Sequence, residues 1–160
     1  MRPGPRALAR RLGGVLVMIL AVGPAAIAAA PSAQAYSNAD RAAYQARLTY
    51  LINAVRVRSG RVSLRPTFCP LWFAARWDYY LAETGRFYHQ SMYPILSTCR
   101  ATVAAENLAR GNASPDSIMA AWMASPEHRA NILDGRLTRI GVTAIYARGT
   151  WTIATDFARS

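Results

Sequence analysis

The chain has 160 residues, of which 52% are hydrophobic and 17% charged, and its formal net charge at pH 7 is +11. This is the composition of an ordinary globular protein, and it excludes a low-complexity or intrinsically disordered chain. All of the basic residues are arginines, and they are dispersed along the sequence. Nucleic acid is therefore not an expected partner.

The first 35 residues have the features of a cleaved secretory signal peptide. Four arginines near the N-terminus precede an apolar stretch over 12–30, and the sequence SAQA at 32–35 supplies a small-residue cleavage signal. We expect cleavage after Ala35, secretion to the extracellular side, and a mature domain over 36–160. A membrane anchor is the alternative, but glycines and a proline shorten the apolar stretch. No other run is long enough to cross a bilayer, so no transmembrane anchor is expected after processing.

Two helices are predicted in the first half of the mature chain. Asn38 is suited to cap a helix that runs to about Ser59, and Gly60 is suited to end it. Apolar residues recur in this helix every three or four positions, which predicts one buried stripe. They are Tyr44, Leu48, Leu51 and Val55. A second helix, over 70–84, carries aromatic residues on several sides and is expected to pack on more than one face.

The long connection after Gly85 contains the first of the two histidines, His89, and ends at Cys99. A connection of this length in a compact domain is usually functional or held in place by other contacts. Cys69 and Cys99 are the only cysteines of an exported chain, and a disulfide between them would stabilise the fold by about 3–4 kcal/mol. Two thiol ligands of a metal are the alternative, which requires reducing conditions and is disfavoured.

Two short helices and a β-hairpin are predicted in the second half. The sequences SPD at 114–116 and SPEH at 125–128 each combine a cap hydroxyl, an early proline and an acid in the first turn. The second of these helices is expected to end near Gly135. Alternating apolar residues over 140–157, with a turn at 148–149, predict the hairpin. Helices followed by a hairpin in one domain indicate an α+β layered fold.

Arginine exceeds the acidic residues in the mature chain. After the first 35 residues, 15 arginines stand against 8 acids, a net charge of +7. This excess favours anionic cell-envelope polymers or lipid head groups as partners. Codon usage combined with solubility is the alternative explanation. Only Arg56, Arg58, Arg61 and Arg65 cluster, and we interpret them as a solvated helix end and loop.

Two histidines and one glutamate are the candidate residues for chemistry. Glu106 lies in an apolar run of small residues, where an unpaired charge would be costly, so His89 or His128 is expected as its partner. His128 lies near the start of a predicted helix, where the partial positive charge favours neutral imidazole, the metal-binding form. The three make a ligand set used by open catalytic zinc sites. They come from separate segments, however, and no HExxH motif is present.

Each of these residues also has a structural interpretation. His89 and His128 could both bond to the backbone, and Ser125 is first of all an N-cap. Glu127 complements the helix dipole and is not expected to be a ligand. A nucleophile pair of Ser125 and His128 lacks the elbow and the oxyanion context, so we discount it. A shared His/Glu site and separate structural roles are equally favoured by the residues alone.

Several motifs appear together in the order typical of the CAP superfamily, the group of cysteine-rich secretory proteins, venom antigens and plant pathogenesis-related proteins. They are LINAVRVRSGRVSL in the first helix, GRFYHQS around His89, AENLARG around Glu106, AWMASPEHRANIL around His128, and TRIGV with WTIATDF in the hairpin. The chain resembles the bacterial secreted branch over nearly all of its mature length. The resemblance implies one domain over 36–160, an α–β–α sandwich with a small central antiparallel sheet.

The resemblance also implies a cleft with two histidines and two glutamates that in some members binds a divalent metal, zinc or magnesium. His89, Glu106 and His128 match three of these positions, and the fourth falls on Ser125, so a metal is expected to bind weakly. The leading hypothesis is a secreted, non-enzymatic module whose His/Glu cleft binds a small-molecule or lipid ligand. The alternatives are a peptidase-like, metal-dependent hydrolase that uses the three residues, and a cell-envelope-binding module that acts through its arginines.

Overall fold

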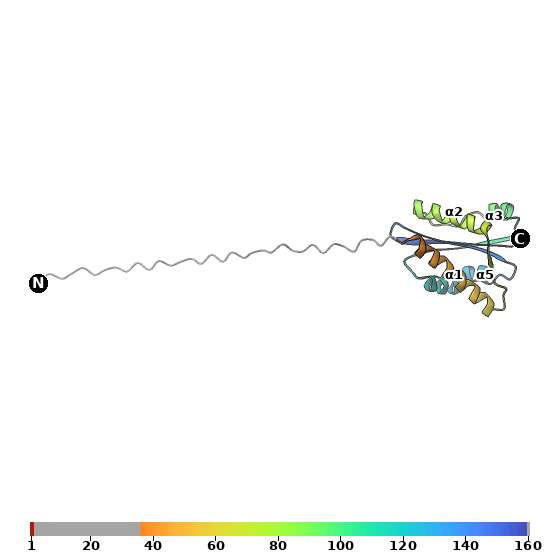
Figure 1. Cartoon of the computed structure of the whole chain (residues 1–160), viewed down its shortest axis with the longest axis horizontal. Helices are drawn as coiled ribbons and strands as arrows, with labels where there is room; N and C mark the ends of the chain where they lie inside the picture. The colour runs from red at the N-terminus through yellow and green to blue at the C-terminus, as the bar shows by residue number, and fades with distance from the viewer. Residues whose placement is uncertain (2–35, 160) are drawn as a thin grey trace. The chain divides into compact units, whose positions relative to one another are not determined.

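The structure is a computed structural model that describes Met1 and residues 36–159 (Figure 1). The predicted signal peptide and its cleavage after Ala35 lie outside the described residues. Within the described part of the chain, none of the helices combines the length and the apolar character needed to span a membrane.

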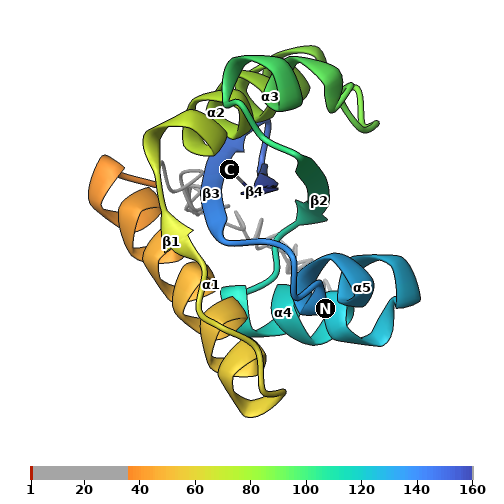
Figure 2. The same cartoon turned by 90° about the vertical axis from the view of Figure 1, so that its right-hand side faces the viewer.

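A four-stranded sheet lies between two layers of helices in a domain formed by the described residues from 36 onward (Figure 2). The helices of this domain are α1 (Asn38–Arg58), α2 (Phe68–Thr84), α3 (Tyr93–Thr98), α4 (Pro115–Ala124) and α5 (Pro126–Leu133). Its strands are β1 (Arg65–Pro66), β2 (Val103–Gly111), β3 (Arg139–Ala147) and β4 (Thr150–Arg159). Helices α1, α4 and α5 cover one face of the sheet, and α2 and α3 cover the other. The expected α+β, α–β–α sandwich is confirmed.

The strands are arranged in the order β1-β3-β4-β2. The predicted hairpin is confirmed as β3 and β4, and β2 pairs antiparallel with β4 along its full length. Strand β1 adds only two residues, parallel to the start of β3. The hairpin turn lies at Arg148 and Gly149, which both adopt positive φ. Strand β2, which carries Glu106, was not predicted as a strand from the sequence.

Two local predictions need correction. The N-cap of α1 is Ser37 rather than Asn38, because Ser37 Oγ accepts the Asp40 amide while the Asp40 carboxylate accepts the Ser37 amide. This is a reciprocal capping box. The connection before Cys99 is not wholly irregular, since residues 93–98 form the short helix α3 with a proline in its first turn.

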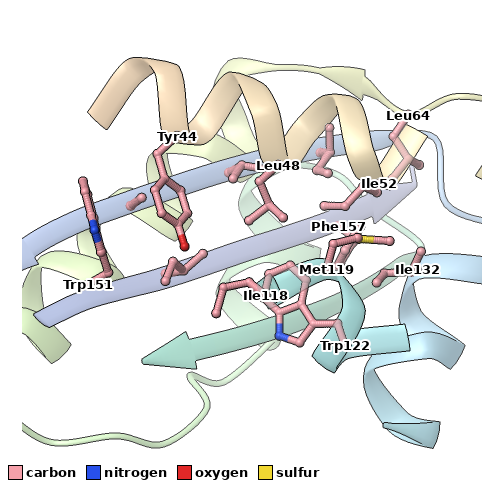
Figure 3. Close-up of a cluster of buried hydrophobic side chains, with 14 of the residues drawn as sticks. Tyr44, Leu48, Ile52, Leu64, Ile118, Met119, Trp122, Ile132, Trp151 and Phe157 are labelled. Carbon is pink, nitrogen blue, oxygen red and sulfur yellow. The ribbon is translucent and has the colours of Figure 1, made fainter. Parts of the chain in front are cut away.

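The main core lies between the sheet and the layer of α1, α4 and α5 (Figure 3). Helix α1 contributes Tyr44, Leu48 and Ile52, which face Ile118, Met119 and Trp122 of α4 across the inward side chains of β4. The buried stripe of α1 therefore runs at a spacing of four residues and continues to Arg56, which is fully buried. The interpretation of Arg56 as a solvated residue is wrong, whereas Arg58, Arg61 and Arg65 are exposed as expected.

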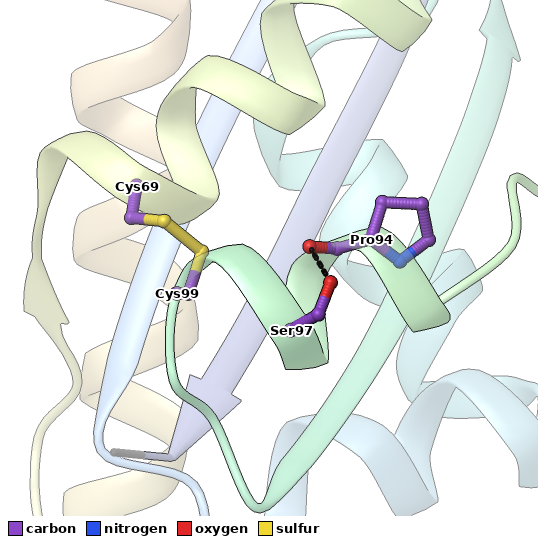
Figure 4. Close-up of a disulfide and its surroundings, with 4 residues drawn as sticks. All are labelled: Cys69, Pro94, Ser97 and Cys99. Carbon is purple, nitrogen blue, oxygen red and sulfur yellow. Dashed lines mark hydrogen bonds between the residues drawn. A yellow bond between two sulfur atoms is a disulfide. The ribbon is translucent and has the colours of Figure 1, made fainter.

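Helix α2 packs directly on the other face of the sheet. A Cβ added at Gly141 of β3 would overlap the backbone of Pro70 and Leu71, so glycine permits this close approach. The expected disulfide between Cys69 and Cys99 is present and joins the first turn of α2 to the residue after α3 (Figure 4). The disulfide therefore closes a covalent loop that contains α2, His89 and α3.

Candidate functional site

His89 and Glu106 lie in direct contact. Strand β2 directs the Glu106 side chain toward the layer of α2 and α3, where it is 2% exposed, while the His89 side chain is 59% exposed. The distance between His89 Nδ1 and Glu106 Oε1 is 2.6 Å. Gln90 completes the contact, because its amide N–H donates to Oε1 at 3.2 Å and its Nε2 donates to Oε2 at 2.9 Å. Glu106 therefore has two hydrogen-bonding partners, the expected His89 and Gln90, which was not predicted.

A second buried carboxylate, Asp156, lies directly opposite Glu106 in the sheet. The same Gln90 Nε2 also donates to both oxygens of Asp156, at 3.2 and 3.0 Å. The alternation of β4 places Ile153 and Phe157 in the main core and so turns Asp156 to the opposite face. Because α2 and α3 cover that face, Asp156 is fully buried. A charged residue in a strand covered on both faces was the signal that could have revealed it.

Burial governs the protonation of this carboxylate pair. Loss of water raises the pKa of Glu106, and the hydrogen bonds from Gln90 and His89 only partly oppose this. The pKa of Asp156 is raised well above its ordinary value, first by burial and then by the charge of Glu106. The pair therefore holds a proton more readily than exposed carboxylates do, and it is a hydrogen-bonded network rather than a free general base.

His128 lies on α5 and makes contacts of its own. Its Nδ1 is 2.9 Å from Ser125 Oγ, and Ser125 Oγ also donates to Glu127 Oε2 at 3.2 Å. Burial, followed by the charge of His89, lowers the pKa of His128, so the expected neutral imidazole is favoured mainly by burial rather than by the helix dipole. Ser125 is the N-cap by position, but its hydroxyl is used by His128 instead of by the backbone.

Asparagines connect α5 to strand β2. Asn131 Nδ2 donates to the Glu106 carbonyl at 3.1 Å and to Asn107 Oδ1 at 2.9 Å. Asn107 in turn donates to the His128 carbonyl at 3.1 Å. A small cleft of about 250 Å³ is lined by His89, Gln90, Glu106, Asn131 and Met92. The structure thus brings His89 and Glu106 together at this cleft, while His128 contacts Ser125 and does not line it.

The arrangement does not fit a metal centre with three protein ligands. Over residue 1 and residues 36–159, no group of three or more His, Cys, Asp or Glu side chains is placed to hold a metal ion. His89 Nδ1 faces Glu106, both oxygens of Glu106 accept hydrogen bonds, and Ser125 brings no carboxylate. Open catalytic zinc sites use three converging protein ligands. We therefore derive no reaction step through a metal.

Zinc binding remains a prediction that a titration can decide. We expect calorimetry on the oxidised protein to give no zinc binding tighter than the micromolar range, because three ligands do not converge. The same titration on His89→Ala and His128→Ala should differ little from the parent. Tight binding that disappears in both variants would show that the two histidines rearrange around the ion, and would contradict the expectation.

A much larger cavity lies elsewhere, between α1 and the start of α2 over strands β1 and β3. This apolar groove has a volume of about 750 Å³. Its lining includes Ala46, Tyr50, Pro66, Phe68, Leu71 and Val142. Tyr50 and Phe68 are 62% and 78% exposed, which is unusual for large apolar side chains that gather at one place. The groove was not foreseen, because its lining comes from three segments that only the fold brings together.

The surface around this groove is basic. Residues 41–77 contain seven arginines and no acidic residue. Arg56 is buried, Arg47 pairs with Asp116 at 2.6 Å, and Arg76 lines a different hollow, which leaves four others. Arg65 directly precedes Pro66 of the lining, and Arg41 lines a smaller hollow that shares Ala42 and Gln45 with the groove. The groove therefore combines an apolar interior with a positive surround.

Comparison with known proteins gives a consistent family and fold. The family model of the CAP, or cysteine-rich secretory protein, family matches residues 49–155. The protein YkwD of Bacillus subtilis is 43% identical over 49 residues, which cover 31% of this chain and 19% of YkwD. The match thus spans about a fifth of that relative.

Solved structures with the same fold come from several bacteria. An outer surface protein of Borrelia burgdorferi has a TM-score of 0.64 at 18% identity, over 70% of this chain and 89% of its own. A cysteine-rich secretory protein of Staphylococcus aureus has a TM-score of 0.68 at 16% identity, over 79% of this chain and 42% of its own. An extracellular SCP-domain protein of Bacillus anthracis has a TM-score of 0.68 at 18% identity, over 79% of this chain and 45% of its own. At such identities these likenesses establish the fold alone.

Proposed function

Because the chain belongs to the cysteine-rich secretory protein (CAP) family, we propose that it is a secreted, non-enzymatic module that binds an apolar ligand with an anionic head group. Secretion is supported by the predicted signal peptide, by the disulfide, and by the similar proteins from Staphylococcus aureus and Bacillus anthracis, which are described as secretory and extracellular. The whole-protein roles of these relatives are not transferred, since two of them are more than twice as long as the matched region.

The apolar groove between α1 and α2 carries this proposal. Its volume of about 750 Å³ is within the usual range for ligand pockets, and its lining is mainly apolar. The His89/Glu106 cleft has about a third of that volume, at about 250 Å³. Its polar groups already satisfy one another, which favours a structural network there over a catalytic centre.

The charge around the groove selects the class of ligand. A purely apolar molecule would use the lining but not the arginines beside it, Arg41 and Arg65. A long-chain fatty acid or a similar amphiphile would bury its chain in the groove and leave its carboxylate among these arginines. The ligand class is therefore an anionic amphiphile.

Blocking the groove should abolish binding of such a ligand. Ala46 is exposed and lines the groove, so Ala46→Trp would fill the space without disturbing the core. We expect the dissociation constant for a long-chain fatty acid, measured by calorimetry on the oxidised protein, to rise by at least about tenfold. Ala120→Trp, on an exposed position of α4, is the matched control and should change it little.

Comparison with the methyl ester of the same fatty acid tests the role of charge. The ester keeps the chain but has no carboxylate, so it should bind more weakly than the acid. The groove is not the ligand site if the fatty acid fails to bind the parent protein. The same conclusion follows if Ala46→Trp and the parent bind the acid equally well.

A further inference from the structure

A second surface, on the opposite face of the sheet from α1, carries one exposed and two partly buried aromatic rings beside arginines. Trp77 and Tyr80 of α2 stack with their ring centroids 5.0 Å apart, and Tyr88 packs edge-on against Trp77 at 5.1 Å. We define these three residues, with Arg76 and Arg86, as the aromatic–arginine surface. None of them contributes to the apolar groove or to the His89/Glu106 contact.

The rings of this surface are held in fixed positions. The Tyr88 hydroxyl lies 2.9 Å from that of Tyr80, and Trp77 Nε1 donates to the Tyr88 carbonyl at 3.0 Å. Arg110 from β2 holds the connecting loop, because its guanidinium donates to the carbonyls of Leu81, Gly85 and Arg86. Tyr88 is nevertheless 45% exposed. The surface is therefore preorganised and accessible, which lowers the entropy lost on binding.

The arginines of this surface have no acidic partners. Among the described residues, the ion pairs of arginine are those of Arg47 and Arg136, and neither lies here. Arg76 stacks on Trp72 with its guanidinium 4.6 Å from the ring, and Arg86 Nη1 donates to the Tyr80 hydroxyl at 3.1 Å. On α2 the only exposed acid is Glu83, since Asp78 is fully buried. The surface is thus positively charged and complementary to an anion.

Two shallow hollows adjoin this surface. One, of about 300 Å³, is lined by Phe73, Arg76, Trp77, Tyr80, Ser91 and Gln90. The other is the small cleft at His89, which also has Gln90 in its lining. A ligand lying across Gln90 would contact both, so the surface is suited to an extended chain rather than to one compact molecule.

We propose that the aromatic–arginine surface binds an anionic glycan, with sugar rings on Trp77, Tyr80 and Tyr88 and acidic groups at Arg76 and Arg86. The C–H bonds of a sugar ring carry partial positive charge and pack on the negative face of an aromatic ring. Sugar hydroxyls can hydrogen-bond to the hydroxyl of Ser91 and to the side-chain oxygen of Gln90, whose N–H groups are already used. An acyl chain would fit better in the apolar groove, which at about 750 Å³ has more than twice the volume of the larger hollow here.

Three polymers of similar length distinguish the contributions of ring and charge. We expect the oxidised protein to bind polygalacturonate, which has sugar rings and carboxylates. It should bind a neutral glucan and polyglutamate at least about tenfold more weakly, because each lacks one of the two features. Added salt should weaken the binding of polygalacturonate, since its charged part is screened. Polyglutamate binding as tightly as polygalacturonate would overturn the proposal, and so would equal binding of the neutral glucan.

Matched substitutions locate the site. Tyr88→Ser and Arg76→Gln should each raise the dissociation constant for polygalacturonate by about tenfold. Tyr50→Ser and Arg58→Gln, both on α1, replace exposed residues of the same types on the opposite face of the sheet and should stay within about twofold. Equal effects of the two members of either pair would contradict the site. Ala46→Trp should leave glycan binding unchanged, so failure of the apolar groove and failure of this surface are separate outcomes.

Discussion

Replacing Arg56 with lysine should lower the free energy of unfolding by at least about 4 kcal/mol, well above the usual effect of one substitution. Arg56 is fully buried, and its guanidinium donates to four main-chain carbonyls at 2.7–3.1 Å. They belong to Val62, Ile132, Asp134 and Leu137. A lysine ammonium is a compact charge with three donors, so it cannot span this set. Carbonyls without a donor would remain in the core.

Arg58→Lys is the matched control for this prediction. Arg58 lies one half-turn further along α1 and is exposed, so its substitution should change stability by less than about 0.5 kcal/mol. Urea denaturation of the oxidised proteins at constant pH measures both values. If Arg56→Lys unfolds at nearly the same urea concentration as Arg58→Lys, then Arg56 does not hold α1 to the chain beyond α5.

The free energy of unfolding of the parent protein should fall as the pH rises, and in Asp78→Asn it should fall less. Asp78 faces the sheet from α2 and is fully buried, and among the described residues neither of its carboxylate oxygens has a hydrogen-bond partner of normal geometry. Burial raises the pKa of Asp78 to about 8, although Thr143 and the charge of Arg110 act in the opposite direction. The folded protein therefore keeps Asp78 protonated at neutral pH.

The sign of the effect follows from the two states of the acid. Between the ordinary aspartate pKa of 3.8 and the raised value of about 8, the unfolded chain has lost the proton of Asp78 while the folded protein retains it. Stability therefore falls with rising pH, by up to about 1.4 kcal/mol per unit. The lowered pKa of His128 acts in the opposite direction near pH 6.5, where half of this imidazole is still protonated in the unfolded chain, but it contributes equally to the parent and to Asp78→Asn.

Urea denaturation at pH 6.5 and pH 8 gives the measurement. Between these two pH values, the free energy of unfolding of the parent should fall by about 2 kcal/mol more than that of Asp78→Asn. Asp116→Asn serves as the control, because Arg47 lowers the pKa of Asp116 and this carboxylate stays ionised in both states throughout the window. A decline as steep in Asp78→Asn as in the parent would show that Asp78 is ionised in the folded protein. Glu106 and Asp156 act in the same direction in both proteins.

The helices, the hairpin and the disulfide were predictable because their signals are local. A helix is indicated by its capping residue and by the glycine after it, and a hairpin by alternation on both sides of a turn, all within a few residues. A single pair of cysteines allows only one intramolecular disulfide. Arg56 was misjudged because a helix end rich in arginine is usually solvated. Its burial depends on carbonyls at Ile132 and beyond, which only the tertiary fold places beside it.

The candidate site was predicted only in part for a similar reason. Residue types alone indicated a partner for Glu106, and His89 is that partner. They gave no reason to choose Gln90 or Asp156, since these join the network through strand register and through a covering helix layer. The apolar groove was beyond reach as well, because it combines segments that are distant in the sequence. The aromatic–arginine surface lies within residues 76–88, but it depends on the loop after Gly85 folding back so that Tyr88 contacts Trp77 and Tyr80.

The two-residue strand β1 has a consequence for the behaviour of the protein at high concentration. The amides of Arg65 and Thr67 both donate to the carbonyls around β3, at 2.9 and 3.1 Å, so they are already used. Pro66 between them has no N–H to offer. An incoming strand from another molecule would find no amide donor on this edge and would meet the charge of Arg65 instead. Strand β1 thus protects the start of β3 against strand-to-strand aggregation.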